Sequence, residues 1–378
     1  MPYNYSATKI FYSKLIERVA FLLLIPFKKH ERKNSDNIKN ILLVEPFQMG
    51  DVLSLTPLIE PLKNKYNNAK IVVLTKPSSG SILKFDSRIS EVLTTDFPWS
   101  DYGVKSNKFS RLWNSFSYIF SLRKYSFDIG IDTRGDIRSQ IILILAGCKK
   151  RIGYTNYLHS NINLRGLLLT TKVQKNKWVH RYEWNLNVLS SLGFSENELF
   201  PTKFPSFIPN KLNLAKESGK KNIVLHIGGG WKYKRWDEEN WVELIIHLSR
   251  IPDQNLFVIA GGGEKDILER IKKLIPEKEN IIFKVTSFEE LIELIYQCDK
   301  FVGLDSGPMN LAVCLNKPVV ALFGPGDSTM WYPLNSESKF IHRKEKFPCN
   351  PCMQTECFYS EKNCMMSIDV DEVVELLN

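Results

Sequence analysis

Several signatures of common protein classes are missing from this sequence of 378 residues. It contains no G-x-x-x-x-G-K-[ST] phosphate loop, no RNA-binding signature motif, no zinc-finger histidine pair and no long run of lysines. Nucleic acid is therefore the weakest candidate partner, and we expect none. No small-residue cleavage site of a secretory signal peptide is evident either, so we expect a cytoplasmic protein.

Long apolar runs are scarce as well. The unbroken apolar stretch 19–26 is too short to span a bilayer, which requires about 20 residues. It lies in an amino-terminal extension, 1–38, and a basic run follows at 28–33. Two interpretations stay open: an amphipathic helix on the cytoplasmic face of the inner membrane, attracted to anionic lipid, or a helix packed on the folded body.

Acidic residues are outnumbered by basic ones, 41 to 51, which gives a formal net charge of +10. This excess indicates an anionic partner, such as a membrane surface or a phosphorylated substrate.

Cysteine is also infrequent, with seven in the chain, and a protein of this length needs no disulfide framework. Cys148, Cys298 and Cys314 lie in apolar stretches and are expected to pack in the core. The other four fall within 16 residues in a polar loop: Cys349, Cys352, Cys357 and Cys364. Zinc or iron held by four thiolates is one interpretation, and unligated thiols are the other.

Apolar strand-like runs alternate with helix-like segments from Ile38 onward, which predicts parallel sheets covered by helices. Expected strands are 41–44, 71–74, 128–132, 223–226, 256–260, 281–285, 301–304 and 319–323, and one helix is expected from about 51 to 66. A segment rich in proline, lysine and asparagine at 201–221 breaks the pattern. We therefore predict two α/β domains, 39–205 and 206–348, facing across a cleft, with a cysteine-rich loop and a last helix at 349–378.

The first strand-to-helix turn, 45–51, ends in Gly50 and Asp51. Ligands of open parallel sheets bind beyond the carboxyl ends of the strands, so these turns are candidate sites. Asp51 at the start of a helix is explained by helix capping. The functional alternative is a carboxylate that takes a proton from an acceptor hydroxyl.

The turn after the strand 223–226 contains Gly228, Gly229 and Gly230, followed by the cations Lys232, Lys234 and Arg235. Backbone N–H groups next to positive charge favour the binding of a diphosphate. A third turn, Asp305-Ser306-Gly307-Pro308-Met309, opens an apolar helix whose amino end suits an anion. A purely structural helix cap explains Ser306 and Pro308 equally well.

Taken together, these motifs resemble glycosyltransferase family nine, the ADP-heptose:lipopolysaccharide heptosyltransferases. The resemblance rests on 50–57, on 226–241, and on 305–309 with 317–325, in this order. It implies a GT-B fold with two Rossmann-like domains, the first for the acceptor and the second for the nucleotide-sugar, and a last helix that returns to the first domain. It also implies inversion at the anomeric carbon without a metal required for catalysis.

The resemblance assigns roles to individual residues. Asp51 is the general base, and Lys234 neutralises the departing diphosphate. Donor contacts are expected from the three glycines, the turn 305–309, Glu264 at the ribose, and Thr286 and Ser287 near the adenine. Acceptor contacts are expected from Gly50, Arg134, Arg138 and Arg151. Asn310 and Gly230 depart from the family pattern, which usually has His and Ser or Thr there.

The implied function is transfer of heptose from ADP-heptose to an anionic lipid-linked inner-core acceptor at the inner membrane. Two alternatives remain: the same chemistry with another nucleotide-sugar or with a protein acceptor, and a non-catalytic nucleotide-sugar-binding protein. The presence of both Asp51 and Lys234 speaks against the second.

Overall fold

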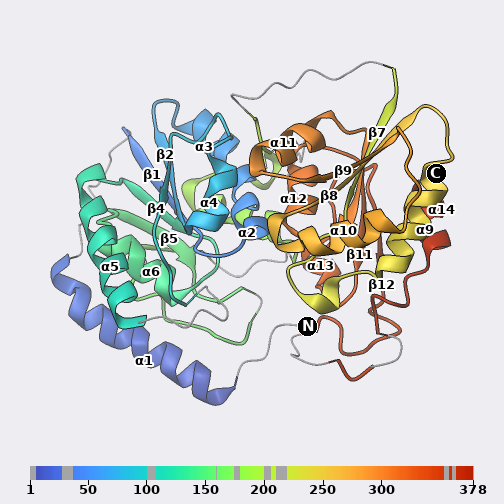
Figure 1. Ribbon diagram of the computed structural model, residues 1–378. Coiled ribbons are helices and arrows are strands. Elements are labelled where there is room, and N and C mark those ends of the chain that lie inside the picture. Colours follow the sequence, from blue (N-terminus) through green and yellow to red (C-terminus); the bar gives the residue numbers. More distant parts are fainter. Residues whose placement is uncertain are drawn as a thin grey trace. The chain divides into compact units, whose positions relative to one another are not determined.

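The computed structural model describes residues 6–27, 37–99, 108–158, 160–173, 179–199, 206–209, 219–352, 357–359 and 363–377. The chain forms two compact units, Met1–Lys203 and Phe204–Asn378 (Figure 1). Each unit is built on one six-stranded sheet in which every pair of strands is parallel. The predicted fold class is therefore confirmed.

The sheet of the first unit has the strand order β3-β2-β1-β4-β5-β6. Its strands are β1 (Asn40–Val44), β2 (Lys70–Thr75), β3 (Glu91–Thr94), β4 (Ile129–Asp132), β5 (Lys150–Tyr154) and β6 (Thr171–Val173). Leu42 in β1 aligns with Val72 on one side and Gly130 on the other. Four consecutive residues of β1, Ile41 to Val44, are at most 1% exposed, as expected for a strand covered on both faces.

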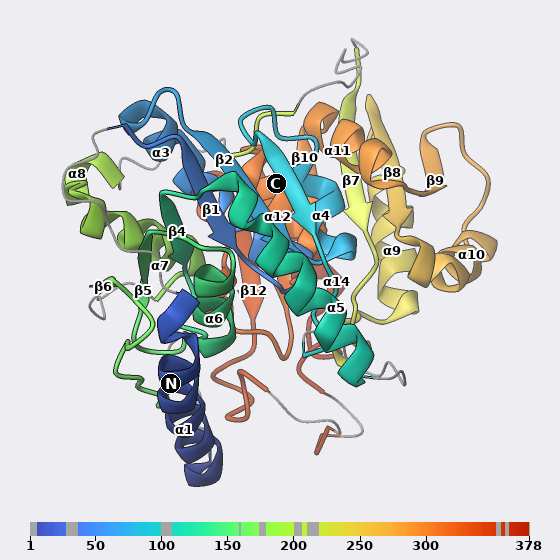
Figure 2. The same cartoon turned by 90° about the vertical axis from the view of Figure 1, so that its left-hand side faces the viewer.

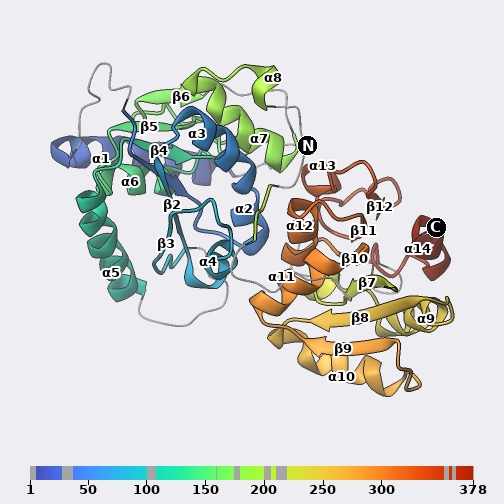
Figure 3. The same ribbon diagram turned by 90° about the horizontal axis from the view of Figure 1, so that it is seen from above.

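Helices cover both faces of this sheet. On one face lie α2 (Met49–Leu53), α3 (Ile59–Lys65) and α4 (Pro77–Leu83), and on the other α5 (Lys108–Ser121) and α6 (Ile137–Leu145), as Figure 3 shows. The shorter helices α7 (Arg181–Asn187) and α8 (Glu196–Leu199) follow β6.

The single helix predicted from about 51 to 66 is wrong, because it is divided into α2, a 3-10 turn (Thr56–Leu58) and α3. Pro57 has no N–H and cannot donate to the carbonyl of Leu53. The hydroxyl of Thr56 donates to that carbonyl instead, at 2.7 Å. The satisfied carbonyl lets the chain turn here without a buried unpaired group.

The amino-terminal extension forms α1 (Ala7–Leu24). This helix lies against α6 at the outside of the first unit (Figures 1 and 2). Its inner face contributes Ile10, Ala20, Phe21 and Leu24 to a small apolar cluster. Of the two interpretations of this segment, packing on the folded body is therefore observed. The basic run 28–33 lies outside the described residues.

The sheet of the second unit has the order β9-β8-β7-β10-β11-β12. Its strands are β7 (Lys221–His226), β8 (Gln254–Ala260), β9 (Ile281–Val285), β10 (Lys300–Leu304), β11 (Val319–Phe323) and β12 (Lys339–His342). Counted from the first strand of each unit, the two sheets have the same order, 3-2-1-4-5-6. This is the doubly wound order of dinucleotide-binding folds.

In the second unit, α9 (Glu238–Leu248) and α10 (Lys265–Lys273) cover one face of the sheet, and α11 (Phe288–Gln297) and α12 (Gly307–Cys314) the other (Figure 3). The capping box predicted for α11 is confirmed, with the Ser287 hydroxyl accepting from the Glu290 N–H at 3.2 Å. The short helix α13 (Ser328–Trp331) follows β11, and α14 (Val370–Leu377) ends the described chain.

The last helix was expected to return to the first domain. Within the second unit, α14 packs on the core, where Val370 and Val373 join Trp241 and Leu244 of α9. The indole N–H of Trp236 donates to the carbonyl of Ile368 at 2.9 Å, which ties the segment before α14 to the same core. Among the described helices, none is long and apolar enough to cross a bilayer.

Candidate active site

Asp51 sits in the first turn of α2, directly beyond the carboxyl end of β1. One carboxylate oxygen, Oδ2, accepts from the backbone N–H of Gln48 at 3.2 Å and so caps the helix. The other oxygen, Oδ1, accepts from Nη1 of Arg134 at 2.7 Å. The capping interpretation is thus correct for one oxygen only, and the second oxygen belongs to a buried charge network.

Arg134 follows β4, the neighbour of β1, so both residues lie at the same edge of the sheet. The same Nη1 lies 3.3 Å from Oε1 of Glu45, which directly follows β1 and is fully buried. The other Glu45 oxygen accepts from Arg181 at 2.8 Å, and that guanidinium is also fully buried. Two cations therefore face two carboxylates, so each buried charge has an opposite partner.

This network sets the protonation of the carboxylates. Burial raises the pKa of Glu45 to about 7, against the opposing effect of Arg134 and Arg181. Burial also acts to raise the pKa of Asp51, but the two arginines and its two hydrogen bonds outweigh it, and the net shift is downward. Asp51 is consequently ionised at neutral pH, as a general base must be before it receives a proton.

Gly50 and Arg138 lie next to this network. Gly50 precedes Asp51 within α2. Arg138, in the first turn of α6, pairs with Asp136 through Nε at 2.9 Å and Nη2 at 2.6 Å. The guanidinium carbons of Arg134 and Arg138 lie 4.0 Å and 5.7 Å from the centroid of the Phe47 ring, within the range of cation–π contacts. The structure therefore brings Gly50, Arg134 and Arg138 close to Asp51.

Arg151 is placed elsewhere. It lies near the start of β5, where it aligns with Gly130, whereas Asp51 lies beyond the opposite ends of these strands. Its buried guanidinium donates to the main-chain carbonyls of Cys148 at 2.8 Å and Leu168 at 2.9 Å. These bonds give Arg151 a structural role in this unit, apart from the Asp51 network.

In the second unit, Lys234 lies in a 3-10 turn (Lys232–Lys234) after the glycine loop. Its Nζ donates to Oδ2 of Asp305 at 2.6 Å, and Asp305 directly follows β10, the neighbour of β7. Arg235 donates to the carbonyl of Gly229 at 2.9 Å, which shapes the loop. The loop after β7 and the turn after β10 are thereby joined at the carboxyl edge of the sheet.

Two glycines at this edge allow neighbouring loops to pack closely against the backbone. A Cβ at Gly228 would meet Cδ of Glu264 at 3.1 Å, so the loops after β7 and β8 lie against each other. A Cβ at Gly326, after β11, would overlap Oδ2 of Asp305. By contrast, a Cβ at Gly230 would meet nothing within 4 Å.

Helix α12 begins at this edge, with Ser306 as its N-cap. Its first backbone N–H groups have no partner within the helix and attract anions. The hydroxyl of Ser306 is buried and makes no hydrogen bond within the described part of the chain. The same holds for Nδ1 of His226, at the end of β7. Unpaired polar atoms buried beside a helix amino end fit a site that an anionic ligand completes.

The remaining predicted donor residues lie at the same edge. Thr286 and Ser287 follow β9, and Gly307 and Pro308 form the first turn of α12. The Met309 side chain is fully buried, so its contribution to a ligand would come from its backbone N–H.

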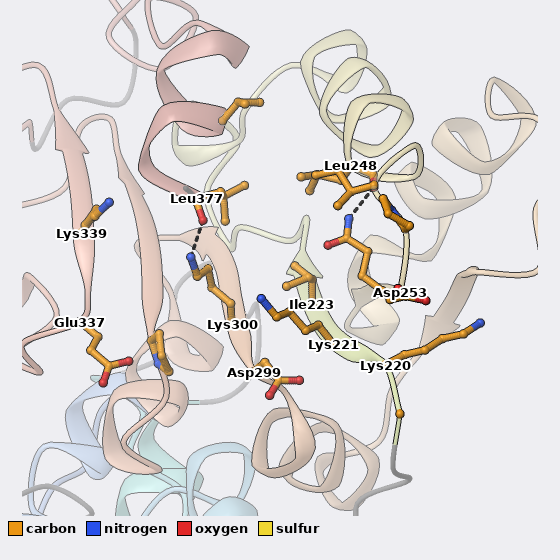
Figure 4. Close-up of a pocket in the computed structure, with 16 residues that line it drawn as sticks. Lys220, Lys221, Ile223, Leu248, Asp253, Asp299, Lys300, Glu337, Lys339 and Leu377 are labelled. Carbon is orange, nitrogen blue, oxygen red and sulfur yellow. Dashed lines mark hydrogen bonds between the residues drawn. The ribbon is translucent and has the colours of Figure 1, made fainter.

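A cavity of about 1020 Å³ lies at the opposite edge of this sheet. Figure 4 shows Lys221, Lys300 and Lys339 along its wall, with Nζ of Lys300 donating to the carbonyl of Leu377. These lysines stand at the amino ends of β7, β10 and β12. Ligands of such sheets bind beyond the carboxyl ends, so this cavity is not the expected donor site.

The cysteines divide as predicted into two sets. Cys148, Cys298 and Cys314 are at most 2% exposed and pack in the cores. The other four line one small enclosed pocket together with Trp231, Tyr233 and Phe347: Cys349, Cys352, Cys357 and Cys364. No three metal-binding side chains of the described residues already surround a common point. Burial raises the pKa of Cys364 to about 11, so its free thiol holds its proton.

Residues 116–363 match the model of glycosyltransferase family 9 (heptosyltransferase). The chain belongs to this family. It is a heptosyltransferase, and therefore a glycosyltransferase. A lipooligosaccharide heptosyltransferase 2 from Campylobacter jejuni is 27% identical over 344 residues, which are 87% of this chain and 94% of that protein.

Solved structures agree with this fold. E. coli ADP-heptose lipopolysaccharide heptosyltransferase II gives a TM-score of 0.67 at 19% identity, over 90% of this chain and 97% of that one. E. coli heptosyltransferase WaaC with ADP-2-deoxy-2-fluoro heptose gives 0.69 at 17% identity, over 89% and 98%. The iron-containing glycosyltransferase TibC of enterotoxigenic E. coli gives 0.50 at 13% identity, over 93% and 76%. At these identities the likeness shows the GT-B-like fold.

Sequence reasoning missed the partners of the catalytic candidates, chiefly Glu45 and Arg181. A signal for Glu45 was present, since an acidic residue directly follows four apolar strand residues. Arg181 gave no comparable signal, because its partner lies 136 positions away along the chain.

Proposed function

We propose that this family member is an inverting enzyme that transfers heptose from ADP-heptose to an anionic, lipid-linked inner-core saccharide at the cytoplasmic face of the inner membrane. In this proposal the first unit holds the acceptor and the second holds the donor. The observation that carries it is the pair of charge centres at the carboxyl edges of the two sheets: Asp51 with Arg134, and Lys234 with the amino end of α12.

Asp51 acts as the general base. The acceptor hydroxyl loses its proton to Oδ1 or Oδ2 of Asp51 while its oxygen forms a bond to the anomeric carbon. The bond between that carbon and the ADP oxygen breaks, and the electron pair leaves with the diphosphate. Arg134 holds the carboxylate in place through the 2.7 Å bond, and with Arg138 it offers positive charge to an anionic acceptor.

The leaving diphosphate gathers negative charge as this bond breaks. Lys234, the glycine loop and the free N–H groups of α12 supply opposite charge and hydrogen-bond donors at one edge of the sheet. The hydroxyl of Ser306 has no partner within the described residues and can donate to a phosphate oxygen. Glu264, next to Gly228, is suited to the ribose hydroxyls, and Thr286 and Ser287 to the adenine end.

No step of this reaction requires a metal. The four cysteines of the enclosed pocket instead provide the donor set of a structural zinc or iron site. The pocket that they help to line has a volume of about 20 Å³, and the four thiols would have to converge on an ion placed there. Because Trp231 and Tyr233 line the same pocket, an ion there would brace the loop that carries Lys234.

The deciding experiment incubates purified protein with a panel of nucleotide-sugars and a phosphorylated Kdo-lipid acceptor, and follows nucleotide release and acceptor mass. We expect release of ADP from ADP-heptose only when acceptor is present, with a mass gain of one heptose and an inverted anomeric configuration by NMR. Release from a different donor alone would reject heptose as the sugar. Donor binding without transfer to the lipid acceptor, followed by transfer to a protein, would reject the acceptor.

A further inference from the structure

The outer face of α1 carries a row of exposed apolar side chains. Six residues on this face are 42–68% exposed: Phe11, Leu15, Ile16, Val19, Leu22 and Leu23. With 3.6 residues per turn, they lie on the side of the helix opposite to Ile10, Glu17 and Phe21, which face the folded body. The helix is thus apolar on both sides, and only its inner side is covered within the described part of the chain.

Contiguous exposed apolar surface of this kind marks an interaction site. Since α1, with four charged residues, is not apolar enough to cross a bilayer, its outer face meets a partner side-on. The folded body holds the helix in place. The carboxylate of the buried Glu17 accepts from the backbone N–H groups of Arg165 and Leu167, each at 2.9 Å. The apolar row is therefore presented in a fixed orientation.

The charges beside this row identify the partner. Helical spacing places Lys14 and Arg18 along one border of the apolar row and Lys9 along the other, and all three are exposed. Glu17, the only acidic residue of α1, is buried. A second copy of the helix would bring cations against cations with no exposed acid to pair with them. A surface of anionic lipid headgroups over an apolar interior matches both the row and its borders.

The border of the apolar row that carries Lys9 leads toward the proposed base. Lys9, Tyr12 and Ile16 line a cavity of about 300 Å³ whose other walls include Arg138 and Tyr157. The Tyr157 hydroxyl bonds to Arg134, which in turn bonds to Asp51. All of these residues belong to the first unit.

We propose that the outer face of α1 is a docking surface for a bilayer rich in anionic lipid, and that it lies in the headgroup region with the helix axis parallel to the membrane. This deepens the proposed function, because it names the surface from which a lipid-linked acceptor reaches Asp51. Only the identity of the acceptor rests on the proposed function. Binding to lipid itself requires neither donor nor turnover.

The test measures co-sedimentation of the full chain with phosphatidylcholine vesicles, with and without 30% phosphatidylglycerol, in the absence of any substrate. We expect binding to the anionic vesicles. The double variant Leu22→Glu/Leu23→Glu should bind at least about tenfold more weakly, because it removes apolar contacts and adds like charge. A matched control, Leu274→Glu/Ile251→Glu, changes two exposed apolar residues of the second unit and should bind as the wild type does.

A second pair of variants tests the borders of the row. Lys14→Glu/Arg18→Glu should lose about tenfold in binding to anionic vesicles, whereas Lys272→Glu/Lys273→Glu, a charge reversal on α10, should not. Wild type that fails to bind anionic vesicles, or that binds them equally well with both α1 variants, would overturn the proposal. So would a wild-type dimer that the Leu22→Glu/Leu23→Glu variant converts to monomer. Loss of transfer activity with intact vesicle binding would count against the proposed function only.

Discussion

Nη1 of Arg134 lies 2.7 Å from Oδ1 of Asp51 and 3.3 Å from Oε1 of Glu45, so one guanidinium nitrogen contacts two carboxylates whose pKa values shift in opposite directions. Arg134 and Arg181 hold the pKa of Asp51 below its ordinary value, while burial raises that of Glu45 to about 7. The arginine therefore keeps Asp51 charged and oriented, and the buried Glu45 holds the arginine.

Replacing Asp51 by Asn keeps the size of the side chain and removes the base. We expect kcat for heptose transfer to fall by about 10²–10⁴ while the Kd for the donor nucleotide stays within twofold. Steady-state kinetics and calorimetric titration with ADP measure the two quantities. The control Glu60→Gln alters an exposed carboxylate of α3 and should leave both unchanged. Full turnover by Asp51→Asn would remove Asp51 from the chemistry.

Gly326 tests the joint between Asp305 and Lys234. A methyl group at Gly326 would overlap Oδ2 of Asp305, which accepts the 2.6 Å bond from Lys234. We expect Gly326→Ala to weaken donor binding by about tenfold or more. Gly262→Ala is the matched control, since a Cβ there meets nothing within 4 Å. Equal donor affinity of the two variants would show that the ion pair does not organise the site.

His226 makes stability depend on pH in a defined direction. Burial lowers its pKa from 6.5 to about 4 in the folded chain. Between these values the unfolded chain binds a proton that the folded chain refuses, so stability is full above pH 6.5 and falls as the pH drops toward 4. The shift corresponds to ~3 kcal/mol at most. Thermal unfolding from pH 4 to pH 8 should show a shallower decline for His226→Gln. Parallel curves for the two proteins would contradict this assignment.

Glu17 is the polar anchor of α1. Removing its carboxylate leaves the N–H groups of Arg165 and Leu167 without their acceptors, at a cost of about 2 kcal/mol. We expect Glu17→Ala to raise the rate of amide hydrogen exchange in residues 7–24 by about thirtyfold, with the strands of the first unit unaffected. Lys14→Ala, an exposed change on the same helix, serves as the reference. Unchanged exchange in Glu17→Ala would mean that apolar contacts alone hold the helix.

The cysteine pocket predicts a metal content. Zinc or iron should be present at about one ion per chain in protein purified without chelator, as measured by elemental analysis. Cys364→Ser should lose the ion, and Cys298→Ser, a change in the core, should keep it. Binding displaces thiol protons, so the content should decrease at acidic pH. Wild-type protein that is purified without chelator, contains no metal and shows four titratable thiols in the pocket would reject the site.

Much of the fold followed from the alternation of strand-like and helix-like segments, because buried parallel strands such as 41–44 and 319–323 are continuous apolar runs. The prediction of one helix at 51–66 was wrong because the spacing of apolar residues continues across Pro57. That spacing does not show that Pro57 lacks the N–H needed for a helical hydrogen bond. Arg151 matches a family position, yet its hydrogen bonds to main-chain carbonyls depend on tertiary structure that a local sequence motif does not contain. For the same reason the role of Arg181 could not be predicted.

Because the two sheets have the same strand order, the Asp51–Arg134 pair and the Lys234–Asp305 pair occupy equivalent positions in their units. In the first unit the acid follows strand one and the cation follows strand four, whereas in the second the cation follows strand one and the acid follows strand four. The position after strand one thus carries an acid in the first unit and a cation in the second, and the position after strand four carries the opposite charge in each. In the reaction proposed above, the acid of the first unit removes a proton and the cation of the second unit receives the departing anion, so the two units would supply complementary halves of one displacement.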